Sequence, residues 1–311
     1  MAASPSHPEQ NRLAGIGLRI GSACAFGVMA AMLKLASDHG VLASEMLFYR
    51  ALFGFPVVVG WLALGPGFGA VRTERRLAHF GRSVLGVSSI LCTFKALTML
   101  SLADATTIGF SAPIFATILS ALILGEKVGR HRWGAVIVGF LGIAIVMRPG
   151  ASGSDISHAG LAIALLSAFG TAGVTITLRQ LSRTEHPAGI VFWFFTYSLV
   201  AGAVLVVVNG SMHAPFVLAI LATGGVMGGT AQLMMTASLK FAPVSVVAPF
   251  DYLQFLWAVL FGWLIWNHGV SAATWTGAAV IIGSGLYTVY REQRLRIRPS
   301  DSATATGALS E

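Results

Sequence analysis

Charged residues are scarce in this sequence: Asp, Glu, Lys and Arg together make up only 10% of its 311 residues. A soluble globular domain usually carries about 25%. Hydrophobic residues account for 55% of the chain, so the deficit of charge is matched by an excess of apolar side chains. This composition predicts an integral membrane protein and leaves little chain for a soluble domain.

Cysteine is nearly absent as well. Cys24 and Cys92 both lie in apolar runs, where a thiol behaves as a small core side chain, so no disulfide framework is predicted. The motifs G-x-x-x-x-G-K-[ST], C-x-x-C, H-E-x-x-H and G-x-S-x-G are also missing. We therefore expect no direct use of ATP and no metal or cofactor, and nothing supports a membrane-embedded enzyme.

Long apolar runs fill most of the chain, and a membrane-spanning helix needs about 20 mostly apolar residues. Ten such runs predict an all-α integral membrane protein with ten transmembrane helices. The polar start MAASPSHPEQNR lacks the charged region of a signal peptide, so no cleavage is expected. The predicted spans are residues 13–36, 44–64, 82–101, 104–124, 131–147, 158–180, 187–208, 216–239, 243–266 and 272–290.

Lys and Arg predict the orientation. If the N-terminus is cytoplasmic, fifteen of them fall on inner segments and only Lys34 and Arg148 on outer ones. The positive-inside rule favours this skew, so both termini are predicted to be cytoplasmic. The net charge of +8 is then a consequence of topology, and no nucleic-acid partner is expected. The inner residues are Arg12, Arg72, Arg75, Arg76, Arg82, Lys127, Arg130, Arg132, Arg179, Arg183, Lys240, Arg291, Arg294, Arg296 and Arg298.

The two halves of the chain repeat each other weakly. Ser22 aligns with Ser167 at one offset, and Gly86 aligns with Gly225 at another. Five spans per half force the second half to insert upside down, which predicts an inverted-topology repeat. Secondary transporters are often built this way, with the substrate site between the halves near the bilayer midplane. The predicted parts are a cytoplasmic tail at 1–12, a first repeat at 13–150, a second repeat at 151–290 and a cytoplasmic tail at 291–311.

Glycine is abundant within the spans. The stretch GGVMGG at 224–229 places Gly224 beside Gly228, and Gly225 beside Gly229, on one helix. Small residues four apart let neighbouring helices approach closely. Static packing is the expected role of these glycines.

One acidic residue interrupts an apolar run, VAPFDYLQFLWAVLFGWLIW at 247–266. Asp251 should lie about 12 Å from the cytoplasmic end, and a charge at the bilayer centre costs about 2.5–3.5 kcal/mol on insertion scales. Pro249 favours a local break, and Gln254 lies on the same helical face. We expect Asp251 and Gln254 to line a wet central cavity, where Asp251 binds substrate or carries a proton. A structural ion pair with Arg19, at a similar depth, is the alternative.

A second polar zone is predicted nearer the outer surface. Arg50 should lie about 9 Å below that surface and Lys95 at a similar depth, with Glu45 and Asp104 above them. Two cations at one level suit an anion or a polar headgroup, and such buried charges argue against a mere scaffold. The alternative is that the side chains extend to the interface, which is as well supported for Lys95 and is preferred for Arg19.

Aromatic residues are concentrated in the second, seventh and ninth spans, where some could stack on a flat substrate. We assign Tyr49, Trp193 and Tyr252 to the candidate site. Most of the others are expected to pack or to face lipid. The whole group is Phe48, Tyr49, Trp193, Phe194, Phe195, Tyr197, Tyr252, Phe255 and Trp257.

With these features, the chain resembles the ten-span family of the drug/metabolite transporter superfamily that is built from two EamA domains. The resemblance covers roughly residues 13–290. It is carried by FYR at 48–50 and by ADATTIGFSAPIFATILSALILGEKVGRHRWGAVIVGFLGIAIVMRPG at 103–150. The segment APFDYLQFLWAVLFGWLIW at 248–266 is similar to the matching stretch of the second half, although Asn267 stands where the family usually has an acid.

The resemblance implies a secondary carrier of a small-molecule substrate that works by alternating access in a bacterial inner membrane. Family branches include uptake of riboflavin or S-adenosylmethionine and export of amino acids or metallophores. The FYR and APFDY segments are most similar to the uptake branches, and riboflavin, a flat ring system, suits an aromatic cavity. Uptake of S-adenosylmethionine and export of amino acids remain alternatives, and an enzyme or scaffold is least favoured. Direction, coupling ion and oligomeric state stay open.

Overall fold

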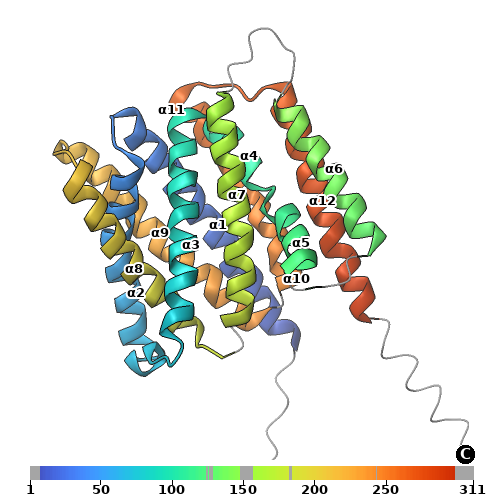
Figure 1. The fold of residues 1–311 in the computed structure, drawn as a ribbon, viewed down its shortest axis with the longest axis horizontal. Helices are drawn as coiled ribbons and strands as arrows, with labels where there is room; N and C mark the ends of the chain where they lie inside the picture. Colours follow the sequence, from blue (N-terminus) through green and yellow to red (C-terminus); the bar gives the residue numbers. More distant parts are fainter. Residues whose placement is uncertain are drawn as a thin grey trace, which may run out of the picture.

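The computed structural model describes residues 8–123, 125, 129–147, 157–181, 184–242 and 244–297. All regular elements in this part are helical, and Figure 1 shows them as one bundle. The start of α1 and the end of α12 lie at the same end of that bundle (Figure 1). Outside the described residues lie 1–7 and 298–311 of the predicted tails, and also Lys127, Arg148 and Arg183.

Each half contributes one series of helices. The first half forms α1 (Pro8–Asp38), α2 (Ala43–Leu64), the 3-10 turn η1 (Phe68–Val71), α3 (Arg76–Met99), α4 (Leu102–Gly109), α5 (Ala112–Ile123) and α6 (Arg130–Met147). The second half forms α7 (His158–Leu181), α8 (Pro187–Asn209), α9 (Pro215–Phe241), α10 (Val244–Val247), the 3-10 turn η2 (Ala248–Tyr252), α11 (Leu253–Trp266) and α12 (Ala272–Ile297).

The predicted spans can be compared directly with these helices. Among the described residues, nine helical segments are long and apolar enough to cross a membrane, and a tenth, shorter apolar helix covers Trp133–Val146. They follow the order of the ten predicted spans, so the prediction of an all-helical membrane protein is confirmed. One boundary differs in a way that matters: α3 begins at Arg76 rather than at residue 82, so Arg82 lies within the helix.

Local sequence explains where several helices begin and end. Pro187 and Pro215 occupy first helical positions, where a missing N–H is no loss. The Ser101 hydroxyl accepts a hydrogen bond from the backbone N–H of Asp104 at 3.1 Å and caps α4. Asn267 ends α11 in the left-handed conformation, with φ of 51°, as asparagine often does.

Two membrane crossings contain a break in the regular helix, one in each half. In the first half, α4 ends at Gly109 and α5 begins at Ala112, just before Pro113. In the second half, α10 gives way to η2, which contains Pro249. A proline removes a backbone donor and interrupts the helical ladder, so a break follows in both crossings. Irregular backbone at membrane depth is tolerated where it lies inside the protein or lines a cavity.

The most extensive helix contacts join the first half to the second. α1 packs on α9, α3 on α7, α2 on both α8 and α9, and α6 on α12, while α4 contacts α11. Glycines permit the close approaches: a Cβ built on Gly229 would lie 2.8 Å from the carbonyl oxygen of Gly54, and one on Gly277 would lie 2.8 Å from that of Gly142. Close helix approach at 224–229 was predicted and is confirmed.

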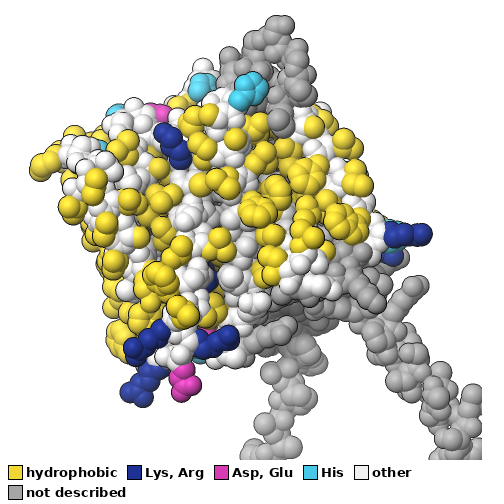
Figure 2. All heavy atoms as spheres, in the orientation of Figure 1, with side chains coloured by type: hydrophobic (Ala, Val, Ile, Leu, Met, Phe, Trp, Pro, Cys, Tyr) yellow, Lys and Arg dark blue, Asp and Glu magenta, His cyan; other side chains and the backbone are white. Residues whose placement is uncertain are grey.

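The outer surface of the bundle is apolar. Figure 2 shows hydrophobic side chains spread across the visible face, while Lys and Arg side chains lie mostly toward its margins. Val204, Val208 and Trp263 are 61%, 74% and 59% exposed. A belt of this kind is matched by the hydrocarbon core of a bilayer and would be a liability in water.

Candidate functional site

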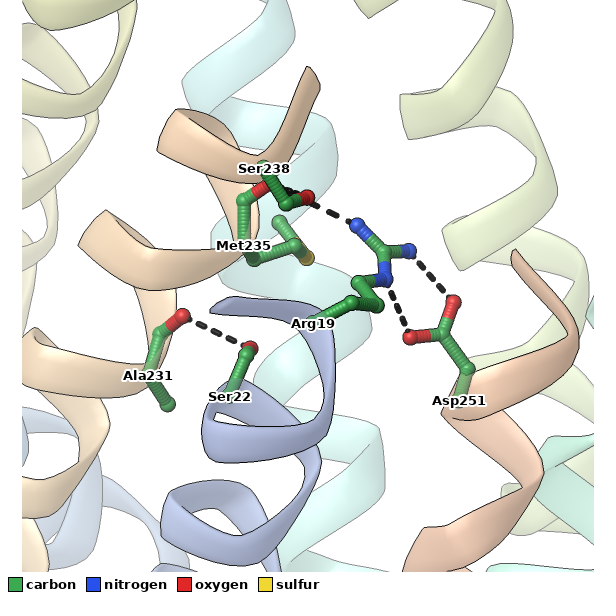
Figure 3. A network of polar contacts seen from close by, with 6 residues as sticks. All are labelled: Arg19, Ser22, Ala231, Met235, Ser238 and Asp251. Carbon is green, nitrogen blue, oxygen red and sulfur yellow. Dashed lines mark hydrogen bonds and ion pairs between the residues drawn. The ribbon is translucent and has the colours of Figure 1, made fainter. Parts of the chain in front are cut away.

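An ion pair joins the first half of the chain to the second inside the bundle. Arg19 of α1 donates from Nε to Oδ1 of Asp251 at 2.5 Å and from Nη2 to Oδ2 of the same carboxylate. Figure 3 shows the two planar groups facing each other edge to edge. Such a two-pronged guanidinium–carboxylate pair combines charge attraction with fixed geometry.

Burial of this pair is uneven. The side chain of Arg19 is 9% exposed, whereas that of Asp251 is 33% exposed. The prediction that Arg19 extends to the inner interface is therefore wrong, because the guanidinium turns inward to a carboxylate that meets both its charge and its donors. The alternative that pairs Arg19 with Asp251 is the one observed. Asp251 nevertheless keeps one third of its side chain exposed.

The break in the ninth crossing positions Asp251. Pro249 precedes Asp251 in η2, and the tight 3-10 turn directs the Asp251 side chain toward α1. Tyr252 follows, and its ring meets that of Phe110 edge-on at a centroid distance of 5.1 Å. Because Phe110 lies at the break in the fourth crossing, the two broken helices meet at their breaks.

The hydroxyl group of Tyr252 occupies space that is left free by a glycine in α12. A Cβ on Gly285 would lie 1.8 Å from that hydroxyl oxygen, so any larger residue would displace the tyrosine. Gln254 is the second residue of α11, directly after this turn, and is half-buried. Of the predicted site residues, Asp251, Tyr252 and Gln254 thus lie on one segment, at η2 and the start of α11.

The helix that carries Arg19 is fixed against α9. The buried Ser22 hydroxyl donates to the carbonyl oxygen of Ala231 at 2.8 Å, and Arg19 Nη1 donates to that of Met235 at 3.5 Å (Figure 3). Gly15 allows the same close approach, since a Cβ there would lie 2.7 Å from that of Ala242. The guanidinium is therefore held by α9 as well as by Asp251.

Arg50 lies in a different place, and no acidic side chain among the described residues pairs with it. It is 2% exposed, and its Nε and Nη1 are buried without a hydrogen-bond acceptor. Its guanidinium carbon lies 5.2 Å from the ring centroid of Phe195 and 6.0 Å from that of Phe194, both on α8. These are cation–π contacts, which attract a cation but do not neutralise it.

Arg82 shares this environment, and sequence reasoning missed it. It was counted as a cytoplasmic residue, but it is 5% exposed, with its guanidinium carbon 4.2 Å from the ring centroid of Phe194. Its Nε and Nη1 also lack acceptors. One signal was available: Arg82 lies four residues before Gly86, hence on the same helical face, and Phe194 packs on Gly86.

Further buried polar atoms without hydrogen bonds lie on the same helices. Within the described residues, every such atom belongs to α2, α3 or α8. Ser83 of α3 and Ser198 of α8 have unpaired hydroxyl groups, and both are nearly inaccessible. His79 belongs to the same set, although its Nε2 lies 3.3 Å from the Glu185 carboxylate. We call Arg50, Arg82, Ser83 and Ser198 the buried donor cluster.

The second polar zone does not form as predicted. Lys95 is exposed and makes no ion pair with any described residue, so it does not join Arg50. Glu45 instead binds the segment between α8 and α9, accepting from Ser211 N at 2.7 Å and contacting His213 Nε2 at 3.0 Å. Asp104 accepts from the Thr274 hydroxyl at 2.6 Å. Both acids tie helix ends together, which leaves them unable to reach Arg50.

Two predicted aromatic residues lie away from Asp251. Tyr49 stacks on Phe53 at a centroid distance of 6.2 Å, on the helix that carries Arg50. Trp193 donates from Nε1 to the carbonyl oxygen of Val71 at 3.0 Å and so anchors α8 to η1. Neither contacts Asp251. Among the residues that the structure describes, no group of three His, Cys, Asp or Glu side chains could hold a metal ion.

Comparison with known proteins adds a family match. The model of the EamA-like transporter family matches residues 13–148 and 158–290. A pseudopaline exporter of Pseudomonas aeruginosa strain UCBPP-PA14 is 29% identical over 86% of this chain and 93% of its own length. A riboflavin transporter of Rhizobium johnstonii is 28% identical over 75% and 77%, respectively. An S-adenosylmethionine uptake transporter of Rickettsia conorii is 25% identical over 83% and 86%.

A solved crystal structure is similar in fold. It aligns with a TM-score of 0.64 over 90% of this chain and 98% of its own length, at 16% sequence identity. At that identity the likeness concerns the fold alone.

Proposed function

The chain belongs to the EamA-like transporter family, and from that membership we propose that it is a secondary transporter that works by alternating access. Membership makes it a small-molecule transporter rather than an enzyme. It is a multi-pass membrane protein whose relatives include bacterial transporters. We propose the inner membrane of a bacterium as its location, with both termini in the cytoplasm.

The pairing of helices across the halves is the observation that carries this proposal. The sequence offsets match α1 with α7 and α3 with α9, so an inverted repeat requires the α1–α9 contact to recur as α7–α3. Both contacts are extensive. The aligned serines Ser22 and Ser167 both take part: the Ser22 hydroxyl donates to the Ala231 carbonyl in one contact, and the Ser167 hydroxyl lies 2.6 Å from that of Thr93 in the other. Two such halves can rock against each other about a site between them.

Asp251 is the residue that we assign to coupling. It lies at the break of a crossing helix, one third of its side chain is exposed, and its partner Arg19 belongs to the other half. Protonation of Asp251, or arrival of a cationic group, would compete with Arg19 for the carboxylate. Release of Arg19 would loosen the contact between the halves at that point, which gives a bound solute a way to bias the two states.

The substrate that we propose first is riboflavin. Supporting it are the riboflavin transporter among the relatives and the aromatic contacts of Tyr252 with Phe110 beside Asp251. Uptake of S-adenosylmethionine is the second candidate, supported by the relative of that name. Export is the third, since one relative is named a pseudopaline exporter, and amino acids are the export substrate to test first.

Growth of auxotrophic bacteria tests the proposal. A strain that cannot make riboflavin should grow at low external riboflavin only when it expresses this protein. A strain that needs external S-adenosylmethionine forms the parallel arm, and immunodetection of the protein in isolated membranes is the control. Rescue in one arm identifies the solute. If neither strain is rescued by protein that is present in the membrane, uptake of both solutes is excluded, and efflux of amino acids from loaded cells is measured next.

The mode of energy coupling has its own measurement. A secondary transporter should accumulate solute in membrane vesicles that carry a proton gradient and no ATP, and a protonophore should abolish that accumulation. Uptake that needs ATP and ignores the protonophore would contradict the proposed mode. Uptake that only equilibrates the solute would indicate a facilitator.

A further inference from the structure

We propose that the buried donor cluster, centred on Arg50 and Arg82, binds an anionic group of the transported molecule, a carboxylate or a phosphate. The proposal rests on the proposed function, because it assumes that the chain carries a small organic solute. It adds a chemical requirement to that function: the solute, or the form of it that is carried, bears a negative charge.

The two arginines are held around one ring. Phe194 lies 4.2 Å from the guanidinium carbon of Arg82 and 6.0 Å from that of Arg50, measured to its ring centroid. The positive charges are therefore close enough to repel each other. Aromatic faces stabilise a cation, but they supply no acceptor for its N–H groups. Both arginines retain buried Nε and Nη1 atoms without an acceptor.

The described part of the chain offers these arginines no counterion. Neither of them forms an ion pair with a described carboxylate, and two described carboxylates of the crossing segments are engaged elsewhere. Glu45 binds the segment at Ser211, and Asp251 binds Arg19. An uncompensated buried charge is strongly unfavourable, and unsatisfied buried donors are rare in native proteins. In a membrane protein such residues mark a substrate or ion path.

Helix register brings a further donor to the level of Arg50. A Cβ on Gly54 would meet Phe195, and one on Gly202 would meet the backbone of Phe48. α2 and α8 therefore run antiparallel in contact, and that register sets Arg50 opposite the turn that contains Ser198. The hydroxyl of Ser198 is fully buried and unpaired. Guanidinium and hydroxyl donors together suit the several acceptor oxygens of a carboxylate or phosphate.

The cluster lies where the halves meet. Arg50 and Arg82 belong to the first half, and Phe194 and Ser198 belong to the second. On the other side of Arg50, a Cβ on Gly228 of α9 would lie 3.3 Å from its Nε and 2.7 Å from the sulfur of Met29 in α1. Movement between the halves would therefore open or close the cluster, as a transported ligand requires.

A purely structural role predicts different behaviour. If the arginines serve only to pack against Phe194 and Phe195, replacing one with methionine loses cation–π contact and lowers stability. If they await an anion, methionine removes an unpaired buried charge, and the ligand-free protein melts at a higher temperature. The two roles therefore predict shifts of opposite sign in the melting temperature.

The substrate candidates differ in the required charge. S-adenosylmethionine carries a carboxylate, whereas riboflavin carries no ionised group at neutral pH and acquires one as riboflavin 5′-phosphate. The cluster therefore ranks S-adenosylmethionine and phosphorylated flavin above riboflavin itself.

Thermal unfolding of the purified full-length protein in detergent tests the inference. The ligands form matched pairs: S-adenosylmethionine with its decarboxylated form, and riboflavin 5′-phosphate with riboflavin, together with inorganic phosphate against chloride at equal ionic strength. We expect at least one member that contains a carboxylate or phosphate group to raise the melting temperature of the wild type more than the partner that lacks this group does. Arg50→Met and Arg82→Met should weaken that binding roughly 10- to 100-fold, the loss expected for one charge-assisted hydrogen-bonding partner.

The possible outcomes are distinct. Anion-dependent stabilisation that both variants lose, with higher melting temperatures of the ligand-free variants, supports the site. Equal responses to both members of every pair, or variants that respond like the wild type, would overturn it. Stabilisation by vesicles of anionic phosphatidylglycerol and by no soluble anion would also overturn it, since the occupant would be a lipid.

Failure of the proposed function looks different. Solute uptake by cells, with no effect of anions on the purified protein, leaves the transporter standing and removes this site. Anion binding that both arginines govern, with no transport of any solute, leaves the site standing and removes the proposed transport.

Discussion

Two places in this protein hold buried arginine side chains, and they differ in whether the chain supplies a counterion. Arg19 meets Asp251 within hydrogen-bond distance, and its charge is balanced by the chain itself. Arg50 and Arg82 are as deeply buried, but the described contacts of their guanidinium groups are with aromatic rings: both contact Phe194, and Arg50 also contacts Phe195. The chain itself supplies a counterion at the first place, and no described residue supplies one at the second. A buried ion pair can hold a protein together, whereas a buried cation without a counterion is strongly unfavourable, and this contrast is the basis of the proposed anion site.

Removing the carboxylate that pairs with Arg19 should have the largest effect on stability. Asp251→Ala leaves Arg19 buried without a counterion, and we expect the free energy of unfolding to fall by about 3–5 kcal/mol. Thermal or chemical unfolding of the purified protein measures the change. The matched control is the double variant Arg19→Leu with Asp251→Leu, which should recover most of the stability because no charge is left unpaired. A double variant as unstable as Asp251→Ala would contradict this account.

The same double variant separates stability from transport. If Asp251 carries the proton or binds the solute, uptake should be absent even though the protein is abundant in the membrane. Asp251→Asn provides the gentler version, because the amide retains one hydrogen-bond acceptor. Uptake by Asp251→Asn with the pH dependence of the wild type would remove Asp251 from the mechanism.

Adding a carboxylate beside Arg50 would give the second place the internal counterion that the first already has. Ser198→Asp supplies an internal acceptor at the level of Arg50, and we expect the ligand-free protein to gain about 1.5–3 kcal/mol, the usual contribution of hydrogen bonds to charged groups. The response to anions should disappear, as measured by ligand-dependent melting. Ser198→Asn has nearly the same shape without the charge and serves as the control. If both variants behave alike, charge balance is not the property that distinguishes the cluster.

Two serine contacts between helices show how much an ordinary neutral hydrogen bond contributes to stability in the same bundle. Ser22→Ala and Ser89→Ala remove neutral bonds at the α1–α9 and α3–α7 contacts. Each should lower stability by about 0.6 kcal/mol, the average for interhelical hydrogen bonds in membranes. Ser89 also lies 2.9 Å from the Thr171 hydroxyl, so its loss should be the larger of the two. Losses above those of Asp251→Ala would show that neutral bonds, not charge balance, dominate.

An exposed cation completes the series with the smallest effect. Lys95 lies on the surface of α3, and Lys95→Gln should change the free energy of unfolding by less than about 0.5 kcal/mol, as surface substitutions usually do. Uptake should match that of the wild type. Arg50→Gln, which makes the same kind of neutral replacement at a buried position, should lose uptake. A Lys95 variant that also loses uptake would reinstate it as a site residue.

The sequence predicted the features that arise from runs of residues. Ten apolar runs became helical segments in the same order, because length and hydropathy alone decide which segments suit a bilayer. Pro249 predicted a break, since the effect of a missing N–H is local. Asp251 could be selected from the sequence alone, because a carboxylate inside an apolar run is energetically costly whichever way its side chain points.

Features that depend on side-chain direction could not be predicted in this way. Arg19 was expected to reach the interface, yet its partner lies 232 residues away, and only tertiary packing brings the two together. Arg82 resembled a loop residue because it follows three other arginines at the helix start. Glu45 was placed at a span end above the two cations, but its partner Ser211 could not be predicted, since it lies in a segment that no periodic pattern describes.

The separation between Arg19 and Asp251 also has a consequence for how the protein is made. At about 5–20 residues per second, the ribosome needs roughly 10–50 s after Arg19 emerges before Asp251 is synthesised. During that time the first helix must enter the translocon with a guanidinium that has no carboxylate to meet. The first helix can therefore settle only late in biogenesis, and a nascent chain stalled before residue 251 should remain a substrate for membrane quality control.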